Sequence, residues 1–164
     1  KTMKKTARIL NGLAMLSLLL GTTANSILAG DLIGLTETLR EVKAAGPGLV
    51  REVSFTTERN LPGDARFLVT YPAGFDVSKA SVFRASGFDG SFSKIIKGQV
   101  LVLSRSGGRT APPGEKIVAL SGIVNKSTNA SYKITLEIQN GVGEVLLGPT
   151  TSARIRPSIH AEEE

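Results

Sequence analysis

Few residues in this chain of 164 could support catalysis. There is no cysteine, and the single histidine, His160, stands after the last predicted strand, beside Glu162–Glu164. A catalytic triad or a histidine-anchored metal site needs partners held rigidly, and chain ends are seldom restrained. No base accompanies the many serines, and Gly-x-Ser-x-Gly is absent. We predict no catalytic residue, no cofactor and an unrestrained acidic tail at residues 158–164.

Three aspartates fall in predicted turns and raise the question of a calcium site. Asp64, Asp76 and Asp89 stand in the segments PGDA, GFDV and GFDG. Calcium prefers carboxylate and carbonyl oxygens, but this spacing matches no calcium-binding loop. An aspartate in a turn bonds the backbone that follows it, which explains each residue without a ligand. We predict turns here and no metal site.

Aromatic side chains are concentrated between residues 67 and 92. An exposed aromatic strip would suggest sugar binding, yet the chain has no tryptophan and only two tyrosines, the usual residues of carbohydrate platforms. Packing in the core is therefore the expected role. Five of the six phenylalanines lie in this segment: Phe67, Phe75, Phe83, Phe88 and Phe92.

Two triplets have the sequence of N-glycan acceptors. Asn125 precedes Lys126 and Ser127, and Asn129 precedes Ala130 and Ser131, in a polar segment between two predicted strands. Modification depends on the organism's machinery. Glycosylation of Asn125 or Asn129 and a plain solvated loop both stay open.

The first 29 residues predict export. Four cations precede an apolar run from Ile9 to Leu20, and a polar stretch with small residues follows. This is the pattern of a secretory signal peptide, with cleavage expected after Ala29. Residues 9–30 carry no charge and are about long enough to cross a bilayer, so retention of the leader as an anchor is the alternative. We predict a secreted or cell-surface protein.

Removal of the leader changes the charge balance. The chain has 20 Lys and Arg against 14 Asp and Glu, and the leader holds four of the cations, so 16 cations would face 14 acids, a net charge of +2. The remaining cations are scattered, with no basic run interleaved with aromatics, so nucleic acid is not a predicted partner. A mature chain of about 135 residues suits one domain. No small-molecule substrate is expected.

Strand patterns dominate from Leu49 onward. Tyr132, Ile134, Leu136 and Ile138 alternate with polar residues, which places four apolar side chains on one face. Similar segments recur about every 8 to 12 residues between Gly, Pro and Asn turns, which indicates an all-β sandwich of about seven to nine strands over residues 49–157. Segments 100–103 and 117–120 are apolar on both faces, the pattern of an inner strand covered on both sides.

The segment from Asp31 to Ala45 is ambiguous. Its leucines fit helical spacing, whereas Ile33, Leu35 and Leu39 with the intervening residues also fit a strand. Gly46, Pro47 and Gly48 then separate it from the body of the chain. Residues 30–48 are therefore interpreted as an extension with a hinge. It either forms the first strand of its own domain or pairs with another subunit.

Several stretches, among them SFTTERNLPGDARFLVTYPAGFDVS (54–78), PGEKIVALSGIVN (113–125) and YKITLEIQN (132–140), resemble the Ig-like β-sandwich repeats of bacterial and archaeal cell-surface proteins. The resemblance covers roughly a hundred residues and implies a single Ig-like sandwich with no shared active site. A more distant analogy, at the level of fold, is with secreted subunits of biofilm filaments and archaeal bundling pili.

Export, one sandwich module and the absence of a catalytic set favour a non-enzymatic protein. The first hypothesis is a structural subunit that self-associates into an extracellular filament by strand addition, with Ile33, Leu35 and Leu39 entering a neighbouring subunit. The alternative is a monomeric adhesion or binding module that recognises a polymer or a protein. Contact with a membrane is expected only through an uncleaved leader.

Overall fold

The computed structural model describes residues 32–42, 48–125, 130–156 and 159–161, and every strand or helix assigned within these ranges is a β-strand. The predicted all-β class is confirmed. None of the described residues forms a helix long and apolar enough to span a membrane. The predicted leader at 1–29 lies outside the described residues. The strands are β1 (Ile33–Val42), β2 (Gly48–Thr57), β3 (Arg66–Thr70), β4 (Phe75–Asp76), β5 (Ser81–Ser86), β6 (Ser91–Lys97), β7 (Val100–Ser106), β8 (Gly114–Ser121), β9 (Val124–Asn125), β10 (Thr135–Gln139), β11 (Val145–Thr151) and β12 (Ile159–Ala161).

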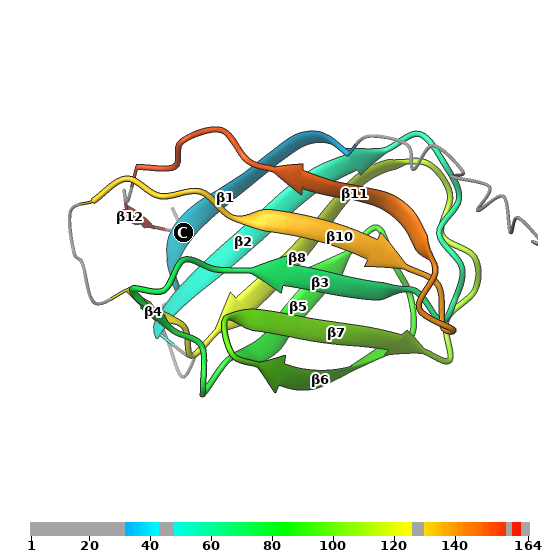
Figure 1. The fold of residues 1–164 in the computed structure, drawn as a ribbon, viewed down its shortest axis with the longest axis horizontal. Helices are drawn as coiled ribbons and strands as arrows, with labels where there is room; N and C mark the ends of the chain where they lie inside the picture. Colours follow the sequence, from blue (N-terminus) through cyan, green and yellow to red (C-terminus); the bar gives the residue numbers. More distant parts are fainter. Residues whose placement is uncertain (1–31, 43–47, 126–129, 157–158, 162–164) are drawn as a thin grey trace, which may run out of the picture.

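The strands form a two-layered sandwich. One sheet has the order β12-β1-β2-β8-β5, the other has the order β11-β10-β3-β7-β6, and β4 pairs with β9 in a small third sheet. Figure 1 shows the second sheet lying across the first. Neighbouring strands are antiparallel except for β1 and β12. The predicted sandwich is confirmed, with β4, β9 and β12 as short additions to the expected strands.

Local sequence explains the regularity of these strands. In β10 and just before it, Ile134, Leu136 and Ile138 are 0, 1 and 0% exposed, as their alternation with polar residues predicts. The hairpin between β6 and β7 turns at Gly98, whose φ of 60° is accessible to glycine at little cost.

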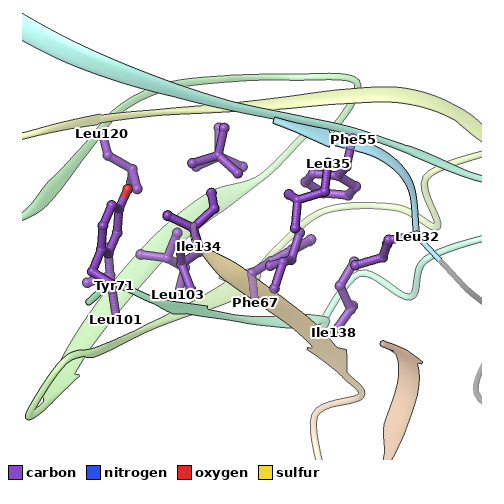
Figure 2. Packing of buried hydrophobic residues seen from close by; sticks show 14 of the residues in the cluster. Leu32, Leu35, Phe55, Phe67, Tyr71, Leu101, Leu103, Leu120, Ile134 and Ile138 are labelled. Atoms are coloured by element: carbon purple, nitrogen blue, oxygen red, sulfur yellow. The ribbon is translucent and has the colours of Figure 1, made fainter. Parts of the chain in front are cut away.

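The core lies between the two sheets and receives side chains from both (Figure 2). Phe67 contacts Phe88 and Phe92, with ring centroids 5.2 and 5.8 Å apart. Core packing of the phenylalanines is confirmed for these residues and for Phe75, which is 5% exposed. Phe83 differs: it is 41% exposed because it lies at an irregularity in the pairing of β5 with β8.

The two segments predicted to be covered on both sides differ. In β8, Val118, Ala119 and Leu120 are all buried, although they point alternately to the two faces, whereas β7 is covered on one side only. β7 lies between β3 and β6, and Leu101 and Leu103 are fully buried in the core. Val100 and Val102 point the other way and remain partly exposed. The prediction that this strand is covered on both sides is therefore wrong, because the sandwich has only two main layers and nothing in the described residues packs over its outer surface.

The predicted extension (30–48) and the predicted tail (158–164) each contribute a strand to the first sheet, β1 and β12. β1 pairs antiparallel with β2, so this sheet begins at Ile33 rather than at Leu49. β12 pairs in parallel with Leu39–Glu41. The tail was predicted to be unrestrained, but residues 159–161, including His160, are held as a strand by backbone pairing with β1.

Candidate binding face

One outer surface of the sandwich is formed by the outward side chains of the sheet β11-β10-β3-β7-β6, and we call it the open face. Successive side chains in a strand point to opposite sides, so the residues between the buried ones face outward. The strand register carries this assignment across the sheet. The open face contains Arg66, Leu68, Thr70, Ser93, Ile95, Lys97, Val100, Val102, Ser104, Thr135, Glu137, Gln139 and Thr151.

An apolar row crosses the middle of the open face. The register places Ile95 opposite Val102, and Val102 opposite Leu68. Ile95 is 56% exposed, and the other two are partly exposed. Side chains directly opposite on antiparallel strands have Cβ atoms about 4.5 to 5.5 Å apart, so the three residues form a continuous strip.

Short neutral side chains flank the apolar row. On one side Thr70 is opposite Thr135, and Thr135 is opposite Thr151, with the two hydroxyls of the latter pair 3.0 Å apart. On the other side Ser93 is opposite Ser104. The same flanking rows include Arg66, opposite Ser104, and Lys97, opposite Val100, and Ile95 is still 56% exposed between them.

The charges of the open face are sparse. Arg66, Lys97 and Glu137 lie on it, and within the described residues none of the three forms an ion pair. Glu137 Oε1 accepts a hydrogen bond of 2.6 Å from Gln139 Nε2. The surface is thus mostly neutral, with its polar groups at the margins of the apolar row.

The opposite outer surface, formed by β1, β2, β8 and β5, is built differently, and we call it the ion-paired face. Glu52 on β2 accepts hydrogen bonds from Arg40 on β1 and Arg84 on β5. Ala119 of β8 lies between Glu52 and Arg84 in register, and its methyl group leaves room for the arginine to cross. Although Ala119 faces outward, it is 0% exposed. Intramolecular ion pairs therefore cover the part of this surface around Ala119.

A second carboxylate is buried on the inner side of the same sheet. Glu37 on β1 is 5% exposed and pairs with Arg51 Nη1 on β2 at 3.2 Å. The Tyr71 hydroxyl donates to Glu37 Oε1 at 2.6 Å, and the Tyr132 hydroxyl donates to Oε2. The Arg51 guanidinium also lies 4.9 Å from the centroid of the Phe75 ring. These bonds compensate the burial of both charges.

The same network keeps the hydroxyls of Tyr71 and Tyr132 protonated. Burial, followed by the charge of Glu37, raises the pKa of Tyr71 well above its usual value. The same two causes raise the pKa of Tyr132. Both hydroxyls are therefore neutral at physiological pH. The chain's two tyrosines thus act as hydrogen-bond donors to Glu37.

The three turn aspartates have different partners. Asp76 Oδ1 accepts bonds from the backbone and hydroxyl of Ser78, as turn chemistry predicts. Asp64 lies against Gly141. Asp89 departs from the prediction, because it binds Arg105 and the backbone of Arg109 instead of the residues that follow it. Within the described ranges, no three His, Cys, Asp or Glu side chains gather to hold a metal.

The residues predicted for subunit contact lie in one strand but in three environments. Leu35 is 6% exposed in the chain's own core, Ile33 is 48% exposed, and Leu39 is partly buried opposite Arg51. Of the two interpretations of this segment, the single chain adopts the one in which it is the first strand of its own domain.

The predicted glycan acceptors are only partly described. Asn125 ends the short strand β9 and is partly buried. Asn129 lies outside the described residues, so glycosylation of either stays a prediction.

Three edge strands of the two main sheets, β5, β6 and β11, carry features that oppose further strand pairing. The irregularity at Phe83 interrupts β5. In β6, Lys94 is in register with core residue Leu103, and its ammonium reaches the carbonyl of Ala80. β11 contains Pro149, which has no N–H, and its pairing with β10 is irregular. Bulges, inward-facing charges and proline are recognised means of protecting an edge.

Sequence reasoning missed the residues of the apolar row. The signal was present: segment 100–103 is apolar on both faces, although only one of them can enter the core of a two-layered sandwich. Ile95 carried no such signal, because its place in the row depends on the register between β6 and β7.

Comparisons with known proteins give a distant structural likeness. No protein-family model matches the chain, and no curated protein matches it. A cohesin module from a Clostridium perfringens family 33 glycoside hydrolase is 16% identical, with a TM-score of 0.40, and the match covers 82% of this chain and 98% of that one. ChBD2 from Thermococcus kodakarensis is 14% identical, with a TM-score of 0.34 and coverage of 71% and 96%.

A third solved structure has similar values. A non-cellulosomal cohesin from Archaeoglobus fulgidus is 14% identical, with a TM-score of 0.35, and the match covers 81% of this chain and 91% of that one. Identities and TM-scores in this range assign no function.

Proposed function

We propose that the chain is a non-enzymatic module that binds another protein through its open face. The observation that carries the proposal is the row of Ile95, Val102 and Leu68, an apolar strip on a rigid sheet that nothing in the described chain covers. A partner that packs on this row removes apolar surface from water, which is the main source of affinity in most protein complexes.

The chemistry of the face favours a protein over a polysaccharide. Sugar rings bind on exposed aromatic platforms, and no aromatic residue is among the members of the open face given above. Tyr71 is 2% exposed, Tyr132 is held in the Glu37 network, and the chain has no tryptophan. A strip of aliphatic side chains bordered by hydroxyls instead matches the apolar centre and polar rim of a protein interface.

The positions of the acidic groups support a role without catalysis. Glu37, Glu52 and Asp89 are each engaged by an arginine, and in the described residues none of them belongs to a group of three or more His, Cys, Asp or Glu side chains. General acid–base chemistry requires paired groups in a cleft. These carboxylates instead act as structural ion-pair partners.

The sheet edges favour a monomer over a filament built by strand addition. β5, β6 and β11 each carry a feature that opposes pairing with another chain. The slot beside β2 is filled by β1 of the same chain, and at the remaining edge β12 pairs with β1 over Leu39–Glu41 only. The predicted leader would deliver the module outside the cell, so we expect its partner on the cell surface or in the surrounding medium.

Binding to surface material tests this proposal. Fluorescently labelled protein is added to cells that produce the chain, with and without prior treatment of the cells by protease. We expect saturable binding that is lost after the cells are treated with protease. Binding that survives protease but disappears after glycosidase treatment would indicate a polysaccharide ligand instead.

Matched substitutions on the two outer faces locate the contact. Val102→Lys places a charge in the apolar row, whereas Ile117→Lys places one on the ion-paired face, on a strand that also lies next to a sheet edge. Both residues are partly exposed. We expect Val102→Lys to weaken binding at least about tenfold, as burying an unpaired charge in an interface should, and Ile117→Lys to leave it unchanged. Equal effects would refute the assignment of the face.

A further inference from the structure

The β5–β6 and β7–β8 connections lie at the same end of the sandwich (Figure 1). Residues of both connections line a separate groove. Its volume is about 510 Å³, and it shares no residue with the open face. Phe88, Ala111 and Pro112 supply apolar surface, and Asp89 and Arg109 supply charge. The wall residues are Gly87, Phe88, Asp89, Arg109, Thr110, Ala111 and Pro112.

Arg105 holds the walls of the groove in place. Its side chain is 0% exposed, and it donates to the carbonyls of Asp89 at 2.8 Å, Pro62 at 3.2 Å and Arg109 at 2.5 Å, and to Asp89 Oδ1 at 2.5 Å. At Gly108 a Cβ atom would lie 2.5 Å from the Asp89 carbonyl oxygen, so the two connections touch through their backbones. The groove is therefore formed before any ligand arrives.

Positive charge exceeds negative charge around the groove. Lys116 is 2% exposed, and its Nζ lies 5.8 Å from the centroid of the Phe88 ring. Burial, and then the charge of Arg105, lowers the pKa of Lys116. Asp89 is the one carboxylate in the wall, because Glu115 is exposed and points to the other face of its strand. Arg105, Arg109 and Lys116 thus outweigh Asp89.

Arg109 is available to a ligand. Its side chain is 95% exposed, and among the described residues its guanidinium makes one ion-pair contact, from Nε to Asp89 Oδ2 at 3.5 Å. The two terminal nitrogens form a fork that fits a carboxylate.

We infer that this groove binds an acidic side chain in a loop of a partner protein. The carboxylate pairs with Arg109, and a neighbouring apolar residue packs against Phe88 and Pro112. The open groove suits a peptide segment, and the surplus of cations selects an acid. The inference does not depend on the open face, because the two surfaces share no residue.

Peptide titration tests the site directly. Uniformly ¹⁵N-labelled protein is titrated with acetyl-Gly-Phe-Glu-Gly-amide and with the analogues that carry Gln or Lys in place of Glu. The glutamate peptide should shift the amide signals of residues 87–89 and 109–111, and the Gln analogue should bind at least about fivefold more weakly, because a charge-assisted hydrogen bond is lost. Equal binding of the three peptides, tighter binding of the Lys peptide, or shifts elsewhere would overturn the inference.

Two variants with opposite expected effects sharpen the test. Arg109→Gln should weaken binding of the glutamate peptide at least about fivefold, whereas Arg154→Gln, also at an exposed position, should not change it. Asp89→Asn removes the competing carboxylate and should tighten binding. If Asp89→Asn does not fold, Arg109→Gln decides: wild-type affinity in that variant refutes the site.

Discussion

The two sheets of the sandwich differ in whether their side chains are paired or covered within the chain. The sheet that contains β1 and β2 binds its carboxylates within the chain, inside through Glu37 and Arg51 and outside through Glu52. The sheet that contains β3 and β7 leaves Val102 and its neighbours on the outer surface without a covering group. Charged groups that are already paired within the chain gain little free energy from contact with a partner. An exposed apolar row gains more, because a partner that covers it removes its surface from water. The difference supports our proposal that the open face is the binding surface.

Breaking the inner ion pair of the first sheet should have the largest effect on stability. Glu37→Ala leaves the Arg51 guanidinium and two tyrosine hydroxyls without their acceptor in a buried site. We expect a loss of about 3 to 5 kcal/mol in the free energy of unfolding, measured by urea denaturation. A loss below about 1 kcal/mol would mean that this network does not hold β1 in the sheet.

The stability of the second sheet should depend on its core-facing side chains and not on its outward-facing ones. Leu136→Ala opens a cavity in the core and should cost about 2 to 5 kcal/mol, and the fully buried Ile134 should behave alike. The adjacent Thr135, on the open face, should tolerate alanine within about 0.5 kcal/mol. Denaturation midpoints in the reverse order would mean that the register of β10 is misassigned.

Alkaline pH should destabilise the first sheet through Tyr71 and Tyr132. Their pKa values are raised in the folded chain, so below pH 10 both states keep the protons and the network is intact. Above pH 10 the unfolded chain loses protons that the folded chain retains, and stability falls with a slope of up to about 1.4 kcal/mol per pH unit for each tyrosine. The slope should be shallower in Tyr71→Phe; an identical slope between pH 10 and 11 would contradict this origin.

The ion-paired face should contribute less, because its arginines are partly in water. Glu52→Ala removes the acceptor shared by Arg40 and Arg84, whose side chains are 41% and 50% exposed. Each pair should contribute about 0.5 to 1 kcal/mol, so the variant should lose about 1 to 2 kcal/mol. A double-mutant cycle with Arg84→Ala measures one pair, and a coupling energy of zero would show that the bridge across Ala119 is not stabilising.

The sequence predicts much of the fold and little of the candidate site. Alternation identified the buried side of β10, because a period of two is a local property. Burial of Glu37 was not foreseen, because its partners lie 14, 34 and 95 residues away. The open face was missed for the same reason: Ile95, Val102 and Leu68 become neighbours only when three strands are placed in register.

Site-specific photo-crosslinking in the producing cells shows which outer face of the sandwich contacts a partner. A photoreactive amino acid is introduced at Val102 on the open face or at Ile117 on the ion-paired face, and the products are identified by mass spectrometry. We expect a crosslink to a different protein from position 102 and none from position 117. Crosslinks from both positions alike, from position 117 alone, or from position 102 only to another copy of this chain would contradict this expectation.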